Sequence, residues 1–195
     1  QYGIEPDENM KKLTVYHVLT MTNGMARHPI MDAEWLKNYL AEPVVAEPGT
    51  EFLYNSSGSC LLGAIVKKKT GKGMREFLKE FLFDKIGIDG ERFQIFRFPD
   101  GYDAEPGTAS VTEDNLRLAI LFMNYGNWNG EQIIAEDWMH MAMSCQISTE
   151  PNGGTEDYRH GYGFQLWNSA IPGVYRFDGG QGQYGLIWPE RKIAV

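Results

Sequence analysis

A tyrosine stands directly before a helical pattern in residues 48–71, PGTEFLYNSSGSCLLGAIVKKKTG. Tyr54 is followed by small polar residues, and large apolar residues then recur at positions 61, 62, 65 and 66. Backbone N–H groups and the macrodipole at a helix N-terminus favour an anionic oxygen, which would lower the pKa of a phenol and make phenolate a usable base. A structural interpretation is also open, in which the Tyr54 ring packs against the helix while Ser56 or Ser57 caps it.

Two other kinds of site are tested by spacing. The segment GQGQYG at 180–185 fits G-x-G-x-x-G, but LIWPE follows it in place of the helix and the acidic residue that a dinucleotide site needs. The histidines have no paired spacing such as i, i+4, so no zinc site is expected; they are His17, His28, His140 and His160. His17 and His140 lie in helical patterns and are interpreted as structural, and His160 has no assigned role. We expect no metal and no cofactor.

The composition indicates a soluble, folded protein. Hydrophobic residues make up 43% and charged residues 23% of the 195 residues, which excludes disordered and low-complexity classes. The net charge is −8 and the one basic run, at 67–69 with Lys72, is short, so nucleic acid is not an expected partner. No apolar run is long enough for a membrane span, and QYGIEPDENMKK is not a signal peptide, which favours the cytoplasm. Cys60 and Cys145 are interpreted as buried thiols.

Helical patterns come first along the chain and strands last. Helices are expected within residues 12–25, 32–44, 56–73, 73–88 and 112–126, and from Glu136. The expected caps are Thr14 and Asp32, with Gly71 as the stop of the third helix. The expected inward-facing residues of the fourth and fifth helices are Phe77, Leu78, Phe81, Leu82, Leu116, Ile120 and Phe122. From residue 161 short aromatic and β-branched runs, at 161–169, 173–179 and 183–189, predict antiparallel strands.

This order predicts an α+β fold, with a mainly helical subdomain over 1–160 and antiparallel strands of an incomplete sheet over 161–195. The last residues, RKIAV, look like a strand without its neighbour, so we interpret the chain as a fragment. A sheet without its neighbouring strands has exposed edges, which predicts self-association.

Five stretches, in this order, resemble a known family: LTVYHVLTMTNGM at 13–25, the block from 47 to 88 that contains EPGTEFLYNSS, residues 108–139, GYGFQLW at 161–167 and GGQGQYGLIWPE at 179–190. The family is that of the β-lactamase-related serine hydrolases, which includes class C β-lactamases, penicillin-binding DD-peptidases and their esterase and amidase relatives. The resemblance covers nearly the whole chain. It implies a β-lactamase/transpeptidase-like fold and a bacterial source.

What the resemblance implies chemically is acyl transfer. In the family, the serine of a Ser-x-x-Lys motif attacks a carbonyl, and the lysine and the tyrosine of a Tyr-x-Asn motif relay its proton. On that alignment Tyr54 is the general base and Ser56 stands in place of the asparagine. Met21 and Asn23 stand at the histidine and serine positions of an earlier family segment.

The third family motif, Lys-Thr-Gly, aligns with Val174, Tyr175 and Arg176. The alignment therefore implies substrate binding by Tyr175, Arg176, Phe177 and Asp178, with Arg176 as the available carboxylate clamp and the Phe177 N–H as the oxyanion donor. Tyr175 and Phe177 are expected on one face of the strand and Arg176 on the other. Without the lysine, an ester, amide or small peptide is a better substrate than a β-lactam.

None of the seven serines is followed three residues later by lysine. The nucleophile is thus expected outside this chain, and the interpretation is a C-terminal fragment of a serine hydrolase that is inactive alone. Two alternatives stay open: a non-catalytic module that binds a ligand through Tyr54, Tyr175 and Arg176, and an interaction domain without a pocket.

Overall fold

The computed structural model describes residues 3–27, 31–150 and 155–195. The chain forms two compact units, Gln1–Phe77 with Ile95–Thr108 and Leu78–Gln94 with Ala109–Val195. Helices alternate with short antiparallel strands, and a four-stranded sheet closes the chain, which confirms the predicted α+β class. The division into domains at residue 160 stays a prediction.

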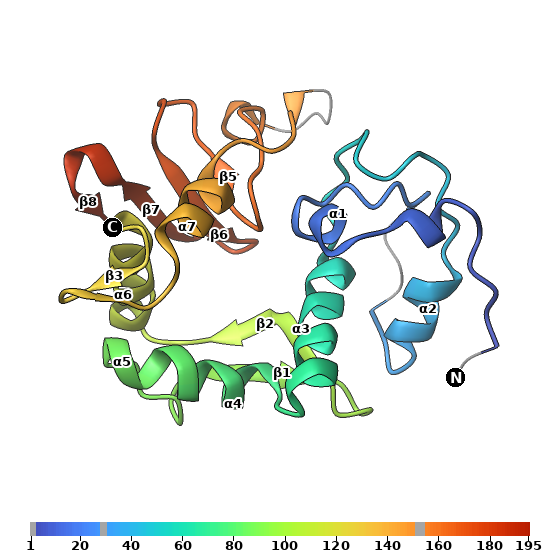
Figure 1. Ribbon diagram of the computed structural model, residues 1–195, viewed down its shortest axis with the longest axis horizontal. Coiled ribbons are helices and arrows are strands. Elements are labelled where there is room, and N and C mark those ends of the chain that lie inside the picture. The colour runs from blue at the N-terminus through green and yellow to red at the C-terminus, as the bar shows by residue number, and fades with distance from the viewer. Residues whose placement is uncertain (1–2, 28–30, 151–154) are drawn as a thin grey trace. The chain divides into compact units, whose positions relative to one another are not determined.

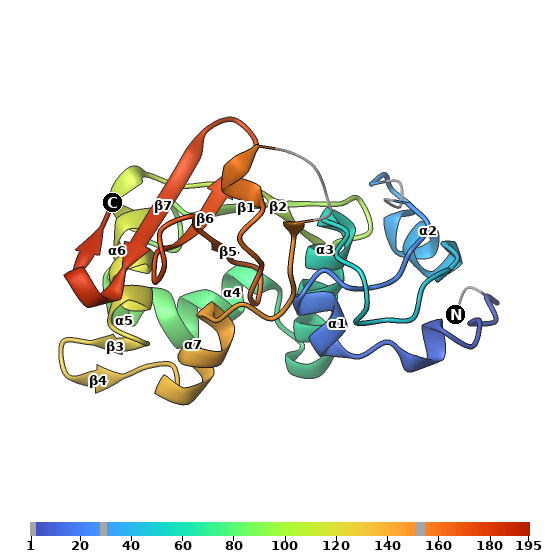
Figure 2. The same ribbon diagram turned by 90° about the horizontal axis from the view of Figure 1, so that it is seen from above.

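The first unit contains short helices around one long helix. Its elements are η1 (Met10–Lys12), α1 (Val15–Leu19), α2 (Trp35–Ala41) and α3 (Ser56–Thr70). Three further elements belong to it except for one end residue each: α4 (Met74–Leu78), β1 (Gln94–Arg97) and β2 (Asp103–Ala109). Both α1 and α2 pack on α3, as the two views of Figures 1 and 2 show. The long helix α3 is therefore the support of this unit.

The ends of these helices follow local hydrogen bonding. Thr14 caps α1 as predicted, because its Oγ1 accepts from the N–H of His17 while its own N–H donates to His17 Nδ1 at 3.3 Å. His17 is thus a structural residue, as predicted. The predicted Asp32 cap is wrong: α2 begins at Trp35, and Asp32 Oδ1 instead accepts from the N–H of Glu34 at 2.8 Å in a turn before the helix.

The core of the first unit lies where α2 meets α3. Trp35 is fully buried; its ring stacks on Phe98 at 5.3 Å and meets the edge of Tyr102 at 5.9 Å. Cys60 lies in the same cluster, which confirms that it is a buried thiol. Helix α3 ends at Gly71 in the left-handed conformation (φ 75°), with lysines 67–69 in its last turn, as expected for the negative end of a helix dipole.

The second unit contains helices that cover one face of an antiparallel sheet. Its elements are the π-helical segment η2 (Lys79–Phe83), α5 (Asp84–Ile86), α6 (Thr112–Met123), β3 (Asn127–Trp128), β4 (Glu131–Gln132), α7 (Glu136–Met143), η4 (Glu156–Tyr158), β5 (Trp167–Asn168), β6 (Tyr175–Gly179), β7 (Gln183–Trp188), η5 (Pro189–Arg191) and β8 (Ile193–Ala194). The main sheet has the order β5-β6-β7-β8. Strands β6 and β7 confirm the predicted runs at 173–179 and 183–189, whereas the run at 161–169 forms a strand only at its end, as β5.

The predicted single helix over 73–88 is interrupted by η2. Because a π turn holds more residues than an α turn, it rotates the residues after it relative to those before it. Phe83 and Ile86 are buried as a result, whereas Phe81, predicted to face inward, is 49% exposed. In α6 the buried apolar residues are Ala119 and Leu121; Phe122 packs on the same core as predicted, whereas the predicted Leu116 is exposed.

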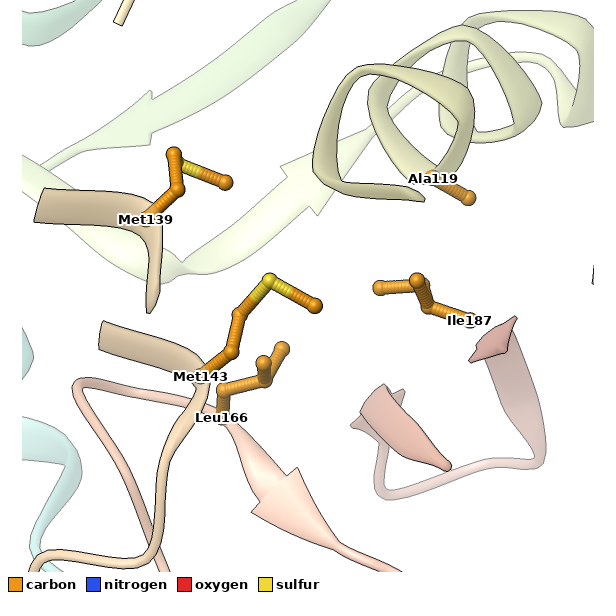
Figure 3. Close-up of a cluster of buried hydrophobic side chains, with 5 residues drawn as sticks. All are labelled: Ala119, Met139, Met143, Leu166 and Ile187. Carbon is orange, nitrogen blue, oxygen red and sulfur yellow. The ribbon is translucent and has the colours of Figure 1, made fainter. Parts of the chain in front are cut away.

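The core of the second unit joins α6 and α7 to the sheet. Figure 3 shows Ala119, Met139, Met143, Leu166 and Ile187, which come from both helices, strand β7 and the turn before β5. This region also tests the predicted start of α7 and the predicted burial of Cys145. Helix α7 begins at Glu136 as predicted, but Cys145 lies past its end at Met143 and is exposed, so its predicted burial is wrong.

Candidate functional site

Tyr54 lies on the surface of the first unit, immediately before α3. Its side chain is 41% exposed, whereas the neighbouring Asn55 and Ser57 are buried. The segment that carries it runs beside the chain after α1: the N–H of Leu53 donates to the carbonyl of Met21 at 2.9 Å. The phenol therefore stands at the N-terminus of a 15-residue helix, on a backbone that other residues hold.

Asn55 caps α3, so the predicted cap by Ser56 or Ser57 is wrong. Asn55 Oδ1 accepts from the N–H of Gly58 at 3.2 Å and from Ser57 Oγ at 2.5 Å. Ser56 is the first residue of the helix and is half-buried. The catalytic role of Ser56 that the resemblance implies is not tested by this geometry and stays a prediction.

Two methionine sulfurs accept hydrogen bonds from Asn55. Its N–H donates to Met21 Sδ at 3.1 Å, and its Nδ2 donates to Met25 Sδ at 3.4 Å. Met21 is buried and has a positive φ of 58° just after α1, and its sulfur lies against the backbone of Asn55. Buried contacts of this kind fix the backbone next to Tyr54, which a positioned catalytic group requires.

A second tyrosine near this segment is unsuited to proton transfer. Tyr39 is buried, and its hydroxyl accepts from Asn23 Nδ2 at 2.9 Å. Burial raises the pKa of the Tyr39 phenol far above its usual value, because the anion would be desolvated. Tyr39 thus stays protonated and acts as a structural partner of Asn23, a pairing that the sequence did not indicate.

In the second unit, the residues of the third motif alternate across β6 as predicted. Tyr175 and Phe177 pack on the core between α6, α7 and the sheet, and the Phe177 ring meets Phe122 at 6.3 Å. A Cβ at Gly185 would overlap the Phe177 ring, so glycine is required opposite it in β7. Burial, followed by the nearby Tyr125 and Glu190, raises the pKa of Tyr175.

Arg176 and Asp178 lie on the opposite face of β6 and bind each other. Arg176 Nε donates to Asp178 Oδ2 at 2.9 Å, and Arg176 is buried. Its guanidinium also lies over the ring of Tyr158. The partners from the 157–167 region were missed at the sequence level, because they are separated from Arg176 by about ten to twenty residues of loop and turn.

The strand register determines where the backbone N–H groups of β6 point. Leu186 exchanges both of its backbone hydrogen bonds with Val195, toward β8, so the neighbouring Gly185 faces β6. Gly185 is the partner of Phe177, whose N–H is thereby directed at β7. Since peptide groups alternate along a strand, the N–H of Asp178 points to the other side, beyond the start of β5.

His160, which had no assigned role, lies 3.3 Å from Glu156 Oε1 through its Nε2, without hydrogen-bond geometry. His140 is structural as predicted, since its ring stacks on Tyr125 at 4.0 Å; His28 lies outside the described residues. Among residues 3–27, 31–150 and 155–195, no group of three side chains could hold a metal ion. Within the same residues, no helix is long and apolar enough to span a bilayer.

Comparison with known proteins decides the family. The beta-lactamase family model matches residues 5–195. The chain belongs to the β-lactamase family. This confirms the resemblance in the sequence and the β-lactamase/transpeptidase-like fold.

Relatives of this β-lactamase-family chain differ in their activities. Monacolin J acid methylbutanoyltransferase from Aspergillus terreus is 29% identical over 108 residues, which are 48% of this chain and 26% of that protein. A putative 6-aminohexanoate-dimer hydrolase from Bacillus anthracis is similar in structure (TM-score 0.74, 19% identity, 95% of this chain and 55% of that one). So is an octameric penicillin-binding protein homologue from Pyrococcus abyssi (TM-score 0.68, 20% identity, 93% of this chain and 50% of that one). The chain thus spans about a quarter of the curated relative and about half of these structural neighbours.

Proposed function

We propose that this chain supplies the proton-accepting tyrosine of a serine hydrolase that works by acyl transfer, with the nucleophilic serine on polypeptide outside these 195 residues. The observation that supports this most is the position of Tyr54. Its exposed phenol stands beside the buried cap of α3, in a chain that matches the β-lactamase family over residues 5–195. No Ser-x-x-Lys pair occurs among the 195 residues.

The proposed step moves one proton and exchanges one acyl group. Tyr54 Oη takes the proton of the serine hydroxyl as the serine oxygen bonds to the carbonyl carbon. The bond to the leaving group then breaks, and the leaving group departs with that proton. Water or an acceptor alcohol then attacks the acyl-enzyme carbonyl and gives a proton to Tyr54 Oη. As the bond between the acyl carbon and the serine oxygen breaks, that proton passes to the serine and restores its hydroxyl.

On strand β6, we assign the oxyanion contact to the N–H of Asp178 in place of the N–H of Phe177. The support is the register, which directs the Phe177 N–H into the ladder with β7 and leaves the Asp178 N–H pointing past the start of β5. A donor already used by a neighbouring strand is unavailable to a developing oxyanion, whereas an edge-facing N–H is available.

We propose a small ester, amide or peptide as the substrate, with β-lactams less favoured because no lysine stands at the third motif. The names of the relatives are consistent with this class, since they include a dimer hydrolase and a methylbutanoyl-group transferase.

The test compares the chain alone with a longer polypeptide that includes the preceding segment. The chain alone should neither be labelled by a fluorophosphonate probe nor hydrolyse p-nitrophenyl acetate above background, and the longer polypeptide should do both. In the longer polypeptide, Tyr54→Phe should slow acylation by roughly 10²- to 10⁴-fold, the usual contribution of a general base. Tyr16→Phe is the matched control, because Tyr16 is similarly exposed at 43% in the same unit.

Labelling of the chain alone, or full activity of Tyr54→Phe, would contradict the proposal. A longer polypeptide that binds small ligands in a thermal-shift assay but is never labelled would support the alternative, a non-catalytic binding module.

A further inference from the structure

The geometry points to Arg176 as a positioning residue that fixes η4 on the sheet, and not as a clamp for a substrate carboxylate. We infer further that the acyl donor carries no carboxylate at the third-motif strand. This second part rests on the proposed function, whereas the first part concerns the second unit by itself.

Three groups hold the Arg176 guanidinium. Its Nε donates to Asp178 Oδ2 at 2.9 Å, and its Nη2 donates to the backbone carbonyl of Asp157 at 2.8 Å. Its Cζ lies 4.8 Å from the centre of the Tyr158 ring. Asp157 and Tyr158 both belong to η4, so one side chain of β6 binds this short helix through its backbone and through a ring.

Aromatic side chains continue this contact into the sheet. Trp167 is the partner of Arg176 in the β5–β6 register, and its ring lies 5.9 Å from the guanidinium. Tyr158 and Tyr162 both meet the Trp167 ring edge-on at 4.8 Å. A guanidinium stacked on aromatic faces is attracted by their quadrupoles, and its planar fork can still donate in the plane.

The charge of Arg176 is buried and neutralised. Only 5% of its side chain and 9% of the Asp178 side chain are exposed. To bind a substrate carboxylate, the guanidinium would have to leave Asp178, which would then be a buried carboxylate without its partner. Arg176 is also the one cationic residue other than histidine between positions 160 and 190. Strands β5, β6 and β7 therefore offer no second cation for a carboxylate.

The first experiment measures hydrogen exchange of the amides at 155–160 in the isolated chain. Arg176→Lys keeps the charge but loses the planar fork, so these amides should exchange roughly tenfold faster or more, while amides of β7 stay protected. Arg191→Lys is the matched control, because Arg191 also lies over a tryptophan, Trp188, at 5.4 Å but is exposed; it should leave 155–160 unchanged. If Arg176→Lys does not fold, Tyr158→Leu tests the same attachment, because it removes the ring contact of the guanidinium with η4 while the hydrogen bond to the Asp157 carbonyl can stay.

The second experiment uses the longer polypeptide and two matched esters, p-nitrophenyl acetate and mono-p-nitrophenyl succinate, of which only the second carries a carboxylate. Arg176→Lys should lower kcat/KM for both esters by the same factor, roughly 10- to 100-fold, mainly through kcat. This is the result expected when the third-motif strand is misplaced relative to the bound ester, whatever charge the ester carries. Wild type should show no preference for the succinate.

A rise in KM confined to the succinate would overturn the inference, since that is the result for a carboxylate clamp. Unchanged exchange at 155–160 in both Arg176→Lys and Tyr158→Leu would also overturn it. If the wild-type polypeptide hydrolyses neither ester, the proposed function fails, and the exchange experiment still decides the positioning role of Arg176.

Discussion

At the N-terminus of α3, three successive residues are all good helix caps, and the structure uses the first. Asn55 accepts two hydrogen bonds through Oδ1 and donates to Met21 and Met25, whereas Ser56 begins the helix proper. Asn, Ser and Ser have similar capping preferences, so the sequence pattern could not choose among them. What distinguishes Asn55 is its pair of hydrogen bonds to methionine sulfurs that lie about thirty residues earlier, in the segment after α1.

This assignment predicts a large difference between two neighbouring substitutions. Asn55→Ala removes the cap and leaves the buried Ser57 hydroxyl without its acceptor, so it should lower the free energy of unfolding by about 2 kcal/mol. Ser56→Ala removes a half-buried hydroxyl that is not the cap and should change it by less than about 0.5 kcal/mol. Urea unfolding followed by circular dichroism measures both.

If Ser56 were the cap, the order of the two variants would be reversed. The helix propensity of alanine acts only at Ser56, the first helical residue, because Asn55 lies outside the helix in an extended conformation. It favours folding at Ser56, so it widens the difference between the two variants and cannot reverse their order.

The elements themselves were well predicted where the apolar pattern and the caps agree. The helices at Thr14, Gly71 and Glu136 start or end as the sequence indicates, and strands β6 and β7 lie within the predicted runs at 173–179 and 183–189. The run predicted at 161–169 forms a strand only at Trp167–Asn168. The predictions fail where the backbone departs from regular geometry. The π turn at Lys79–Phe83 exchanges the roles of Phe81 and Phe83, and the helical period gives no sign of the extra residue.

The carboxylate of Asp7 joins the start of the short helix η1 to the chain after α2, beside a hydrogen bond from Asn9 Nδ2 to the Val44 carbonyl. We expect this carboxylate to make the first unit sensitive to acid. Asp7 Oδ1 accepts from the N–H of Met10 at 2.6 Å, and Oδ2 accepts from the N–H of Val44 at 3.1 Å. These hydrogen bonds, led by the one from Met10, lower the pKa of Asp7 below its usual value of 3.8. The unfolded chain therefore binds the proton more readily than the folded one.

The free energy of unfolding that Asp7 contributes decreases on acidification. The contribution of Asp7 is complete above the unfolded pKa and is lost as the pH falls through the lower, folded pKa. Asp7→Asn should be less stable than wild type near pH 6, and the difference should shrink as the pH approaches about 3. Unfolding free energies from urea titrations across this range measure it. A difference that stays constant or grows on acidification would show that the carboxylate does not carry the interaction.

At the scale of the whole chain, the sequence predicted the family because five stretches occur in the right order, and the match over residues 5–195 confirms it. It could not predict how the chain divides into two compact units, since each unit is built from segments far apart in sequence. Residues 78–94 belong with the C-terminal sheet unit, although they lie in the predicted helical region. Contacts over such separations leave no local pattern in either segment.

The outer face of the main sheet carries exposed apolar side chains, from which we predict the association state of the chain in solution. Strand pairing places Tyr184 and Leu186 on the same face as Arg176, and Ile193 and Val195 continue that face at β8. All four are exposed, whereas Ile187 on the other face is fully buried. Contiguous exposed apolar side chains favour association. Strand β8, the last strand in the order of the described sheet, is only two residues long, so we expect the face to contribute more than the edge.

We therefore predict that the isolated chain self-associates and that the outer face carries the contact. Light scattering should show an average mass that rises with concentration for wild type. Leu186→Lys combined with Ile193→Lys should keep the mass at that of a monomer, because a new interface would bury both charges. Val45→Lys, at an exposed apolar residue of the other unit, is the control and should associate as wild type does. A wild type that is monomeric at all concentrations, or a double variant that associates equally well, would exclude this face as the interface.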